Sequence, residues 1–301
     1  MKTLKYIIII ILLILIVFQC NPLANSDKNS HEIILQTLGT SSNTGLSESK
    51  EIISKRLRAL QIKHFEIDQN NERSQLIIHL GDSLSLRDIS NVILARGQVY
   101  FCPVPDKQDI IKTMSKLDST TRLESGINFS DILKLLEIQT NFAGHGSNIG
   151  QAEIKDTAII MKSLNSKAVK DLLPLDVKFL WGAKANDQKK FGLFVVSLTN
   201  SISGKTIKDA GKTGTTPKET GVVMAFNKEG ADLWKDLTGR NLGKSVAIVI
   251  DNKVYAAPIV RSCVNNGECI ITGNFTANEI NNLIAVLKNG ELPLRFESMT
   301  N

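Results

Sequence analysis

The sequence predicts an α+β protein, with a ferredoxin-like βαββαβ unit over residues 31–104 followed by a larger region of mixed helices and strands. Short runs in which apolar and polar residues alternate are typical of strands, and the apolar residues between those runs recur with helical spacing. The order of the runs in 31–104 is that of a split βαβ unit. After residue 221 the patterning is again regular, and it predicts further strands and helices.

The elements of the first unit follow from periodicity, caps and turns. Apolar residues share one face of the first helix, and Asn70-Asn71 predicts the turn of a hairpin. Ser85 begins the second helix with capping-box spacing, and Gly97 ends it. We expect strands at 32–38, 63–68, 75–80 and 98–104, with helices at 47–60 and 85–96.

The pattern is weaker between residues 105 and 220 and sharp beyond them. In the weaker part we expect helices at 106–117, 130–138 and 163–173, a strand at 191–198, and loops at 141–150 and 211–220. In the sharper part we expect strands at 221–226, 245–250 and 253–257 and a helix at 228–238. A capping box at Thr276 and a stop at Gly290 bound the last predicted helix.

The N-terminus has the features of an export signal. Lys2 and Lys5 precede an apolar run at 6–18 that is shorter than the roughly 20 residues of a membrane span. Cys20 follows, where a lipoprotein signal places its modified cysteine. We expect residues 1–19 to be a signal peptide or anchor, 20–30 a tether, and the mature chain a membrane-anchored lipoprotein on the periplasmic side; an uncleaved short anchor and simple secretion are the alternatives.

Charge and cysteines narrow the function further. The 301 residues carry a net charge of +6, and the lysines are scattered rather than clustered, which argues against a nucleic acid partner.

Cys263 and Cys269 flank Asn265-Asn266-Gly267, so a hairpin there would place them opposite each other and favour a disulfide; two reduced packing cysteines are the alternative. Cys102 is expected to be a buried thiol.

Motifs that imitate catalytic sites fail on spacing. Gly243-Lys244-Ser245 ends like a phosphate-binding loop, but Thr238 stands where the first glycine is needed and a strand is predicted to follow. Ser47 to Lys50 imitates one penicillin-binding motif, but the Ser-x-Asn element comes before it, in the wrong order. The histidines are isolated from other metal ligands. We therefore expect no catalytic residues, no metal, no cofactor and no enzymatic activity.

An ordered series of residues in the last third of the chain is similar to a known family. It comprises Gly221-Val-Val-Met-Ala-Phe-Asn-Lys-Glu-Gly-Ala-Asp-Leu-Trp, Leu237-Thr238, Asn241, Gly243-Lys244, Ala247-Ile-Val-Ile-Asp251, Val254-Tyr-Ala-Ala-Pro258, Ile271-Thr-Gly-Asn-Phe-Thr276 and Val286-Leu-Lys-Asn-Gly-Glu-Leu-Pro293. This series resembles the large periplasmic domain of the protein-export factors SecD and SecDF. The motif positions that carry the resemblance are Asn227, Gly230, Thr238, Asp251, Pro258, Gly273, Phe275, Thr276, Gly290 and Pro293.

The resemblance implies a domain plan. It divides the chain into a ferredoxin-like base at 31–104, a mixed α/β head at 105–290 and a strand that returns to the base at 291–297. Residues 105–195 match poorly. The series is not followed by the family's membrane helices, so we expect a chain that lacks the transmembrane translocase portion.

The resemblance also implies a function. A SecD-like protein of this plan would assist protein export by binding emerging or unfolded polypeptide or the Sec translocase. The alternative is an orphan envelope lipoprotein that acts as a structural or interaction module without a role in export.

Overall fold

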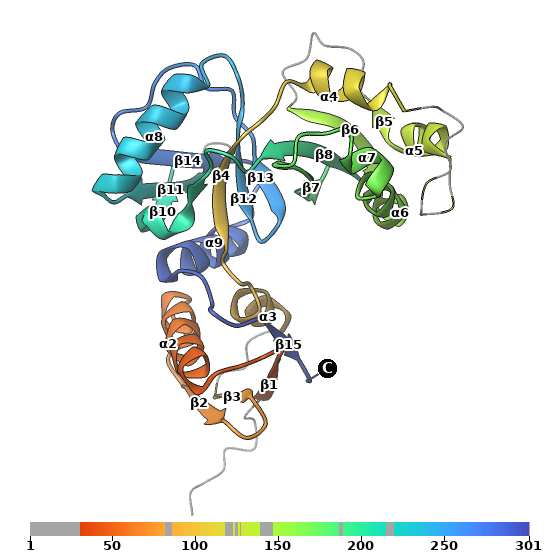
Figure 1. The fold of residues 1–301 in the computed structure, drawn as a ribbon. Coiled ribbons are helices and arrows are strands. Elements are labelled where there is room, and N and C mark those ends of the chain that lie inside the picture. The colour runs from red at the N-terminus through yellow and green to blue at the C-terminus, as the bar shows by residue number, and fades with distance from the viewer. Residues whose placement is uncertain are drawn as a thin grey trace, which may run out of the picture.

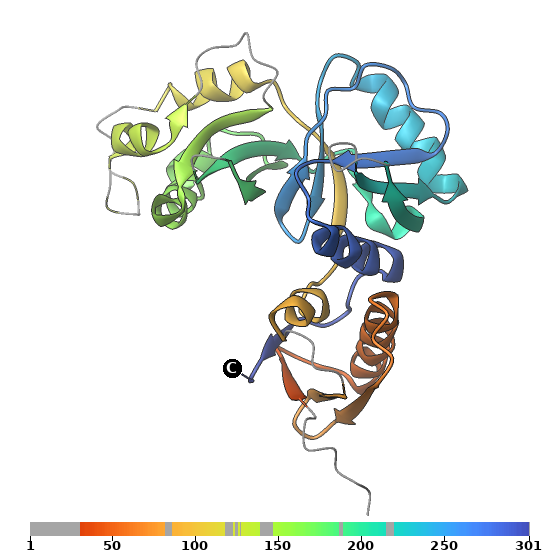
Figure 2. The ribbon, with the colours of Figure 1, turned by 180° about the vertical axis from the view of Figure 1, so that it is seen from behind.

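The computed structural model describes residues 31–81, 86–117, 123, 126, 128–138, 147–186, 189–214 and 220–300. The fold is a mixed α/β one in which the strands form three sheets of four, three and eight strands. A small module that carries the C-terminus lies below two upper lobes, with α9 between them (Figures 1 and 2). The predicted signal peptide, tether and lipidated Cys20 lie outside the described residues.

The lower module, which we call the base, is a four-stranded antiparallel sheet with helices on one face. The strand order is β15-β1-β3-β2, and α2 and α3 bury Ile53, Leu57 and Ile89 against the inward side chains of the strands. The base comprises β1 (His31–Thr37), α2 (Asn43–Ala59), β2 (Phe65–Asn70), β3 (Gln75–Leu80), α3 (Leu86–Ile93) and β15 (Phe296–Ser298).

One strand of the predicted base lies elsewhere. β4 (Val99–Pro103) pairs with β12 (Val246–Ile250) and β9 (Ile202–Ser203) in the eight-stranded sheet, so the expectation that it closes the base was wrong. The position beside β1 is occupied by β15, which pairs through Thr37–Phe296 and Leu35–Ser298. The physical reason is burial: Phe101 is completely buried among the aromatic side chains of the upper lobe.

The eight-stranded sheet joins the two upper lobes. Its order is β5-β6-β8-β7-β13-β12-β4-β9, and the helices α4 to α7 pack a separate core against the strands that are nearest to β5. The remaining elements of this sheet and lobe are β5 (Glu137–Ile138), β6 (Asn148–Glu153), β7 (Val177–Ala185), β8 (Lys190–Ser197), β13 (Lys253–Ala256), α4 (Lys107–Met114), α5 (Phe129–Leu135), α6 (Thr157–Leu164) and α7 (Lys167–Lys170).

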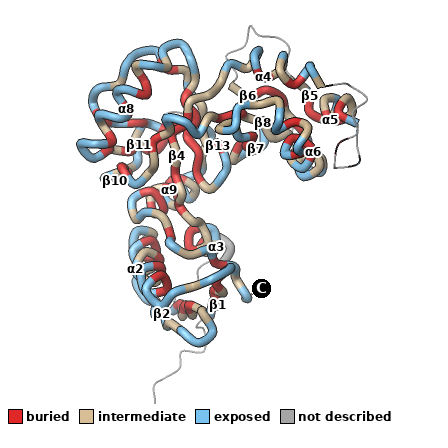
Figure 3. Tube along the Cα trace, viewed as in Figure 1, coloured by how far each residue is buried: buried red, intermediate tan, exposed pale blue. Residues whose placement is uncertain are grey.

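A three-stranded sheet and two helices complete the other lobe. The strand order is β10 (Ile207–Thr213), β11 (Gly221–Phe226) and β14 (Glu268–Thr272), and the core contains residues of α8 (Lys228–Arg240) and α9 (Ala277–Asn289). Phe101, Phe226 and Trp234 stack at its centre with ring centroids 5.1 to 5.6 Å apart. Buried residues follow the inner faces of these elements in both lobes and in the base (Figure 3).

Several sequence predictions in the weaker region were wrong in kind or extent. The helix expected at 163–173 is two shorter helices, α6 and α7, and the loops expected at 141–150 and 211–220 overlap β6 and β10. β10 contains a glycine, an aspartate and two lysines, so its pairing with β11 is not evident from local propensity. The strand after Gly243 is confirmed, because β12 follows where a phosphate-binding loop requires a helix.

Candidate functional site

Two hollows meet where the lobes and the base approach each other. One, of about 490 Å³, lies between α3, the β12–β13 turn and α9; the other, of about 670 Å³, lies against β6, β7, β8 and β13. Ala183, Lys184, Tyr255 and Phe275 line both, so the hollows adjoin each other. We call the two hollows together the junction groove.

The groove follows a split in the eight-stranded sheet. β7 and β13 share the single parallel pair Gly182–Val254 among the pairings that the structure describes. β7 and β8 are paired up to Trp181, and the register shifts before Ala185. The backbone of residues 183 and 184 therefore lies outside a regular ladder where it lines the groove, which is an arrangement that would allow an added extended segment to form main-chain hydrogen bonds.

Aromatic side chains supply much of the groove's apolar surface. Phe194, Tyr255 and Phe275 all line it and are half-buried. Desolvation raises the pKa of the Tyr255 hydroxyl, and the nearby carboxylates of Asp251 and Glu279 raise it further. Tyr255 is therefore a neutral hydrogen-bonding group at physiological pH.

Lys184 bridges β7 and the start of α9 at the groove, and we call this contact the strap. Its Nζ donates to Glu279 Oε2 at 2.7 Å and to the Asn274 carbonyl at 2.6 Å, and it lies 4.8 Å from the centre of the Phe275 ring. Partial burial opposes ionisation of Glu279, but hydrogen bonds from Lys184 and Thr276 outweigh it and hold the pKa of this carboxyl below its usual value. The strap thus joins the end of β7 to the start of α9.

Three motif residues of the resemblance shape this end of the groove. Thr276 caps α9 in a reciprocal capping box with Glu279. A Cβ on Gly273 would lie 2.9 Å from the Phe275 ring, so the glycine permits the ring to fold back over its own loop. The sequence located the cap; it did not reveal that Lys184, from a distant strand, binds the same carboxylate.

Asp251 connects the β12–β13 turn to the chain that enters the upper lobes from α3. Asp251 and Asn252 have φ angles of 49° and 61°, which confirms the predicted tight turn. The Asp251 carboxylate accepts from the amides of Gly97 at 3.1 Å and Gln98 at 2.9 Å. This second role, which joins the turn to Gly97 and Gln98, was not predicted because the contacting residues are distant in sequence.

Arg56 clamps the two chain segments that leave the base. Its side chain is completely buried, and it donates to the carbonyls of Val92, Ala95, Arg96 and Gly290. Desolvation lowers the pKa of this guanidinium to about 10, an effect that the charge of Asp251 opposes. Arg56 is thus still charged at neutral pH. Gly290 is the motif residue here, with a φ of 82° at the end of α9.

The remaining motif residues lie away from the groove, in the upper lobe except for Pro293. Asn227 caps α8 by accepting from the Gly230 amide at 2.8 Å, and a Cβ on Gly230 would lie 2.6 Å from Thr206. Buried Thr238 accepts from the Val264 amide at 3.0 Å. The Pro258 carbonyl accepts from Val246, and exposed Pro293 precedes β15.

The predicted cysteine hairpin is wrong. Cys263 and Cys269 are free thiols in the structure: Cys263 is exposed and its Sγ donates to the Lys235 carbonyl, whereas Cys269 lies on β14. β14 pairs with β11, because this pairing buries Cys269 and Ile271 in the core. Burial raises the pKa of the Cys269 thiol to about 12, and Cys102 is buried as expected.

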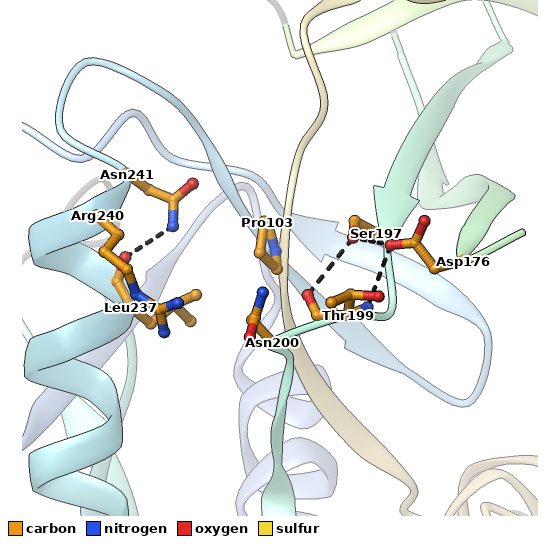
Figure 4. A pocket seen from close by; sticks show the side chains of 8 residues that line it. All are labelled: Pro103, Asp176, Ser197, Thr199, Asn200, Leu237, Arg240 and Asn241. Atoms are coloured by element: carbon orange, nitrogen blue, oxygen red, sulfur yellow. Dashed lines mark hydrogen bonds between the residues drawn. The ribbon is translucent and has the colours of Figure 1, made fainter. Parts of the chain in front are cut away.

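A third hollow, of about 390 Å³, lies between the C-terminal end of α8 and the end of β8 (Figure 4). Its polar side chains are engaged with one another and with backbone: Ser197 and the Thr199 amide donate to Asp176, and Asn241 donates to the Leu237 carbonyl. These bonds hold the pKa of Asp176 below its usual value. The polar side chains that line this hollow thus form a structural cluster. The hollow is therefore less suited to bind polypeptide than the more apolar junction groove.

The described residues contain no group of three histidine, cysteine, aspartate or glutamate side chains arranged to hold a metal ion. The groove has instead an aromatic lining, two residues of β7 outside the regular ladder and one ion pair. That combination binds by apolar contact and main-chain hydrogen bonding.

Comparison with known proteins agrees with the residue series. The protein-family model described as the SecDF P1 head subdomain matches residues 181–294 of the sequence. Protein translocase subunit SecD of Rhodothermus marinus is 34% identical over 155 residues, which are 50% of this chain and 25% of that protein. The corresponding subunit of Leptotrichia buccalis is 37% identical over 100 residues, 33% of this chain and 25% of that protein. The chain is therefore similar to the SecD/SecDF family over residues 181–294, the part that matches the head subdomain.

Solved structures agree in fold. A structure described as a membrane component SecDF that enhances protein export has a TM-score of 0.53 and 18% identity, covering 90% of this chain and 99% of that one. SecDF in its super-membrane-facing form has a TM-score of 0.55 and 17% identity, covering 99% of this chain and 34% of that one.

The extent of the match limits the activity that can be assigned to this chain. The chain spans about a quarter of the length of the curated SecD relatives that it matches. SecD and SecDF are accessory components of protein translocation and not enzymes, in agreement with the sequence prediction. Within the part of the chain that the structure describes, every helix is too short or too polar to cross a bilayer.

Proposed function

We propose that this chain assists protein export by holding unfolded or emerging polypeptide in the junction groove, outside the cytoplasmic membrane. The observation that carries the proposal is the position of the groove: an aromatic-lined hollow along a split in the sheet, with most of its lining in the segment that matches the SecDF head. The similarity to SecD and SecDF does not favour the alternative of an orphan module without an export role.

The groove's chemistry supports selection for unfolded chains. An unfolded polypeptide exposes both apolar side chains and unpaired backbone groups, whereas a folded one buries most of each. Each aromatic side chain that contacts a bound segment gains about 25 cal/mol for every Å² of apolar surface removed from water. A few such contacts give binding that is weak enough to release a moving chain.

The proposal includes a membrane tether. A lipid on Cys20, or a short anchor at residues 1–19, would hold the base near the membrane through the segment 20–30, with the groove in the upper lobes beyond it. The Sec translocase is the proposed partner because the matching relatives are protein translocase subunits. Incorporation of labelled fatty acid that is lost in a Cys20→Ser variant would support lipidation, and unchanged incorporation would contradict it.

Binding to an unfolded exported polypeptide, with the same polypeptide folded as the control, tests the main proposal. Ala183→Arg fills the groove from a half-buried position without removing a core side chain. We expect it to weaken binding of the unfolded form about tenfold or more. Leu175→Ser, at a fully exposed apolar residue outside the groove, is the matched control and should bind like the wild type. Equal binding of the folded and unfolded forms would contradict the proposal.

A further inference from the structure

The base sheet has a second face that α2 and α3 do not cover. Ile33, Leu35, Leu76, Ile78 and Leu80 point toward the helices and form the core of the base. Because side chains alternate along a strand, the residues between them point to the opposite face. The outward residues are Glu32, Ile34 and Gln36 on β1, Glu66, Asp68 and Asn70 on β2, Gln75, Ile77 and His79 on β3, and Glu297 on β15.

The strand register places an apolar row across the middle of this outer face. Asp68 is opposite Ile77, and Ile77 is opposite Ile34. The Met299 amide donates to the Ile34 carbonyl at 2.9 Å, and Met299 is 60% exposed. Ile77, Ile34 and Met299 thus form a short apolar row that crosses three strands.

Acidic residues border the row on its sides and at one end. On one side Glu66 and Glu32 are each opposite His79, and on the other Glu297 is opposite Gln36. The side chains of Asp68 and Glu32 are 59% and 52% exposed, 3.2 and 3.8 Å from the ring nitrogens of His79. None of the outward strand positions of the base that the structure describes is a lysine or arginine, although the sequence has a net charge of +6.

We propose that this acidic outer face of the base docks a basic amphipathic helix of a partner protein. Neighbouring strands are about 4.8 Å apart, so the apolar row spans roughly 10 Å. An apolar stripe on a helix repeats every 3 or 4 residues, or about 4.5–6 Å, and matches this row. Lysines or arginines beside such a stripe would meet the carboxylates on both sides. A second copy of the same face, or an anionic lipid surface, would place like charges together.

A designed helical peptide of leucine and lysine, with the leucines in one stripe, is the probe. It would be titrated against the full-length chain at low ionic strength, beside a peptide of the same composition with scrambled leucines and one with glutamate in place of lysine. We expect the striped basic peptide to bind most tightly. Exchanging Glu66 and Glu297 for lysine, or Ile34 and Ile77 for serine, should weaken its binding about tenfold.

Two controls keep the test specific. Glu48→Lys with Glu229→Lys changes the net charge equally at exposed positions on α2 and α8, and should leave binding unchanged. Ala183→Arg blocks the junction groove and should also have no effect, so this proposal and the proposed function can fail separately. Equal weakening by the Glu48 and Glu229 exchanges, or equal binding of the scrambled peptide, would overturn the proposal, because either would show attraction by net charge alone.

Discussion

Replacing Arg56 tests how the base is joined to the upper lobes. Arg56→Met retains much of the apolar stem but removes the guanidinium that donates to four backbone carbonyls at the two chain crossings. A hydrogen bond to a charged group contributes about 1.5–3 kcal/mol, so simple addition over the four would give about 6–12 kcal/mol. Bonds that share one donor group are not additive, and disrupting a buried ionic network typically costs about 3–5 kcal/mol.

We therefore expect Arg56→Met to lower the free energy of unfolding by about 3–5 kcal/mol. Arg56→Lys, which keeps the charge but not the planar fork, should be intermediate. Chemical denaturation followed by circular dichroism measures the change, and limited proteolysis near residues 94–98 reports local opening. Lys55→Met, at an exposed lysine on the same helix, is the control and should unfold like the wild type. A loss of less than about 1 kcal/mol for Arg56→Met would refute the clamp.

Further predictions concern α8, the strap and the thiols. Gly230→Ala should destabilise the protein by about 1–3 kcal/mol through overpacking, because its Cβ would lie 2.6 Å from Thr206. Gly239→Ala, whose Cβ would make only an ordinary van der Waals contact at 3.7 Å from Cys263 Sγ, should stabilise it by about 0.5–1 kcal/mol. Thermal unfolding distinguishes the two, and equal effects would contradict the packing argument. Because the pKa of Glu279 is lowered in the folded protein, its ionised carboxyl stabilises the fold above pH 4.5. Lys184→Met should therefore have a lower free energy of unfolding than the wild type above pH 4.5, and this difference should disappear as the pH falls below that value. Denaturation over a pH series measures it. Cys263 should react with a maleimide in the native protein, and mass spectrometry showing it oxidised would contradict a free thiol.

Local signals predicted the elements whose ends depend on neighbouring residues. The cap at Thr276 and the stop at Gly290 both bound α9 as expected, because a capping box and a left-handed glycine act within one helical turn. The hairpin from β2 to β3 was also predicted, since the turn between them contains Asn70 and Asn71. The mixed α/β class and the family follow from the same regular segments.

The sequence did not predict which strands share a sheet. β4 has the alternating pattern of a strand, but that pattern does not say whether Phe101 will be buried in the base or in the upper lobe. The cysteine hairpin failed for the same reason, because β14 pairs with a strand more than forty residues earlier. The burial of Arg56 could not be predicted either, because a buried arginine on a helix has the same sequence pattern as an exposed one.

The junction groove was equally hidden. Its lining comes from α3, β6, β7, β8, β13 and α9, and the predictions for β6 and β7 were wrong or absent. Motif residues such as Gly273 and Phe275 were identified by resemblance, but their place in the groove lining, beside Lys184 of a distant strand, is visible only in the fold. A site built from segments that are distant in sequence can be located only once the fold is known.

The most direct test of the central claim is site-specific photo-crosslinking from the groove. A photoreactive residue at position 183, which lines both hollows, is compared with one at position 229, on the exposed start of α8. We predict that an unfolded exported polypeptide is crosslinked from position 183 and not from 229, and that its folded form is crosslinked from neither. Equal crosslinking from both positions, or crosslinking from 229 alone, would contradict polypeptide binding in the junction groove.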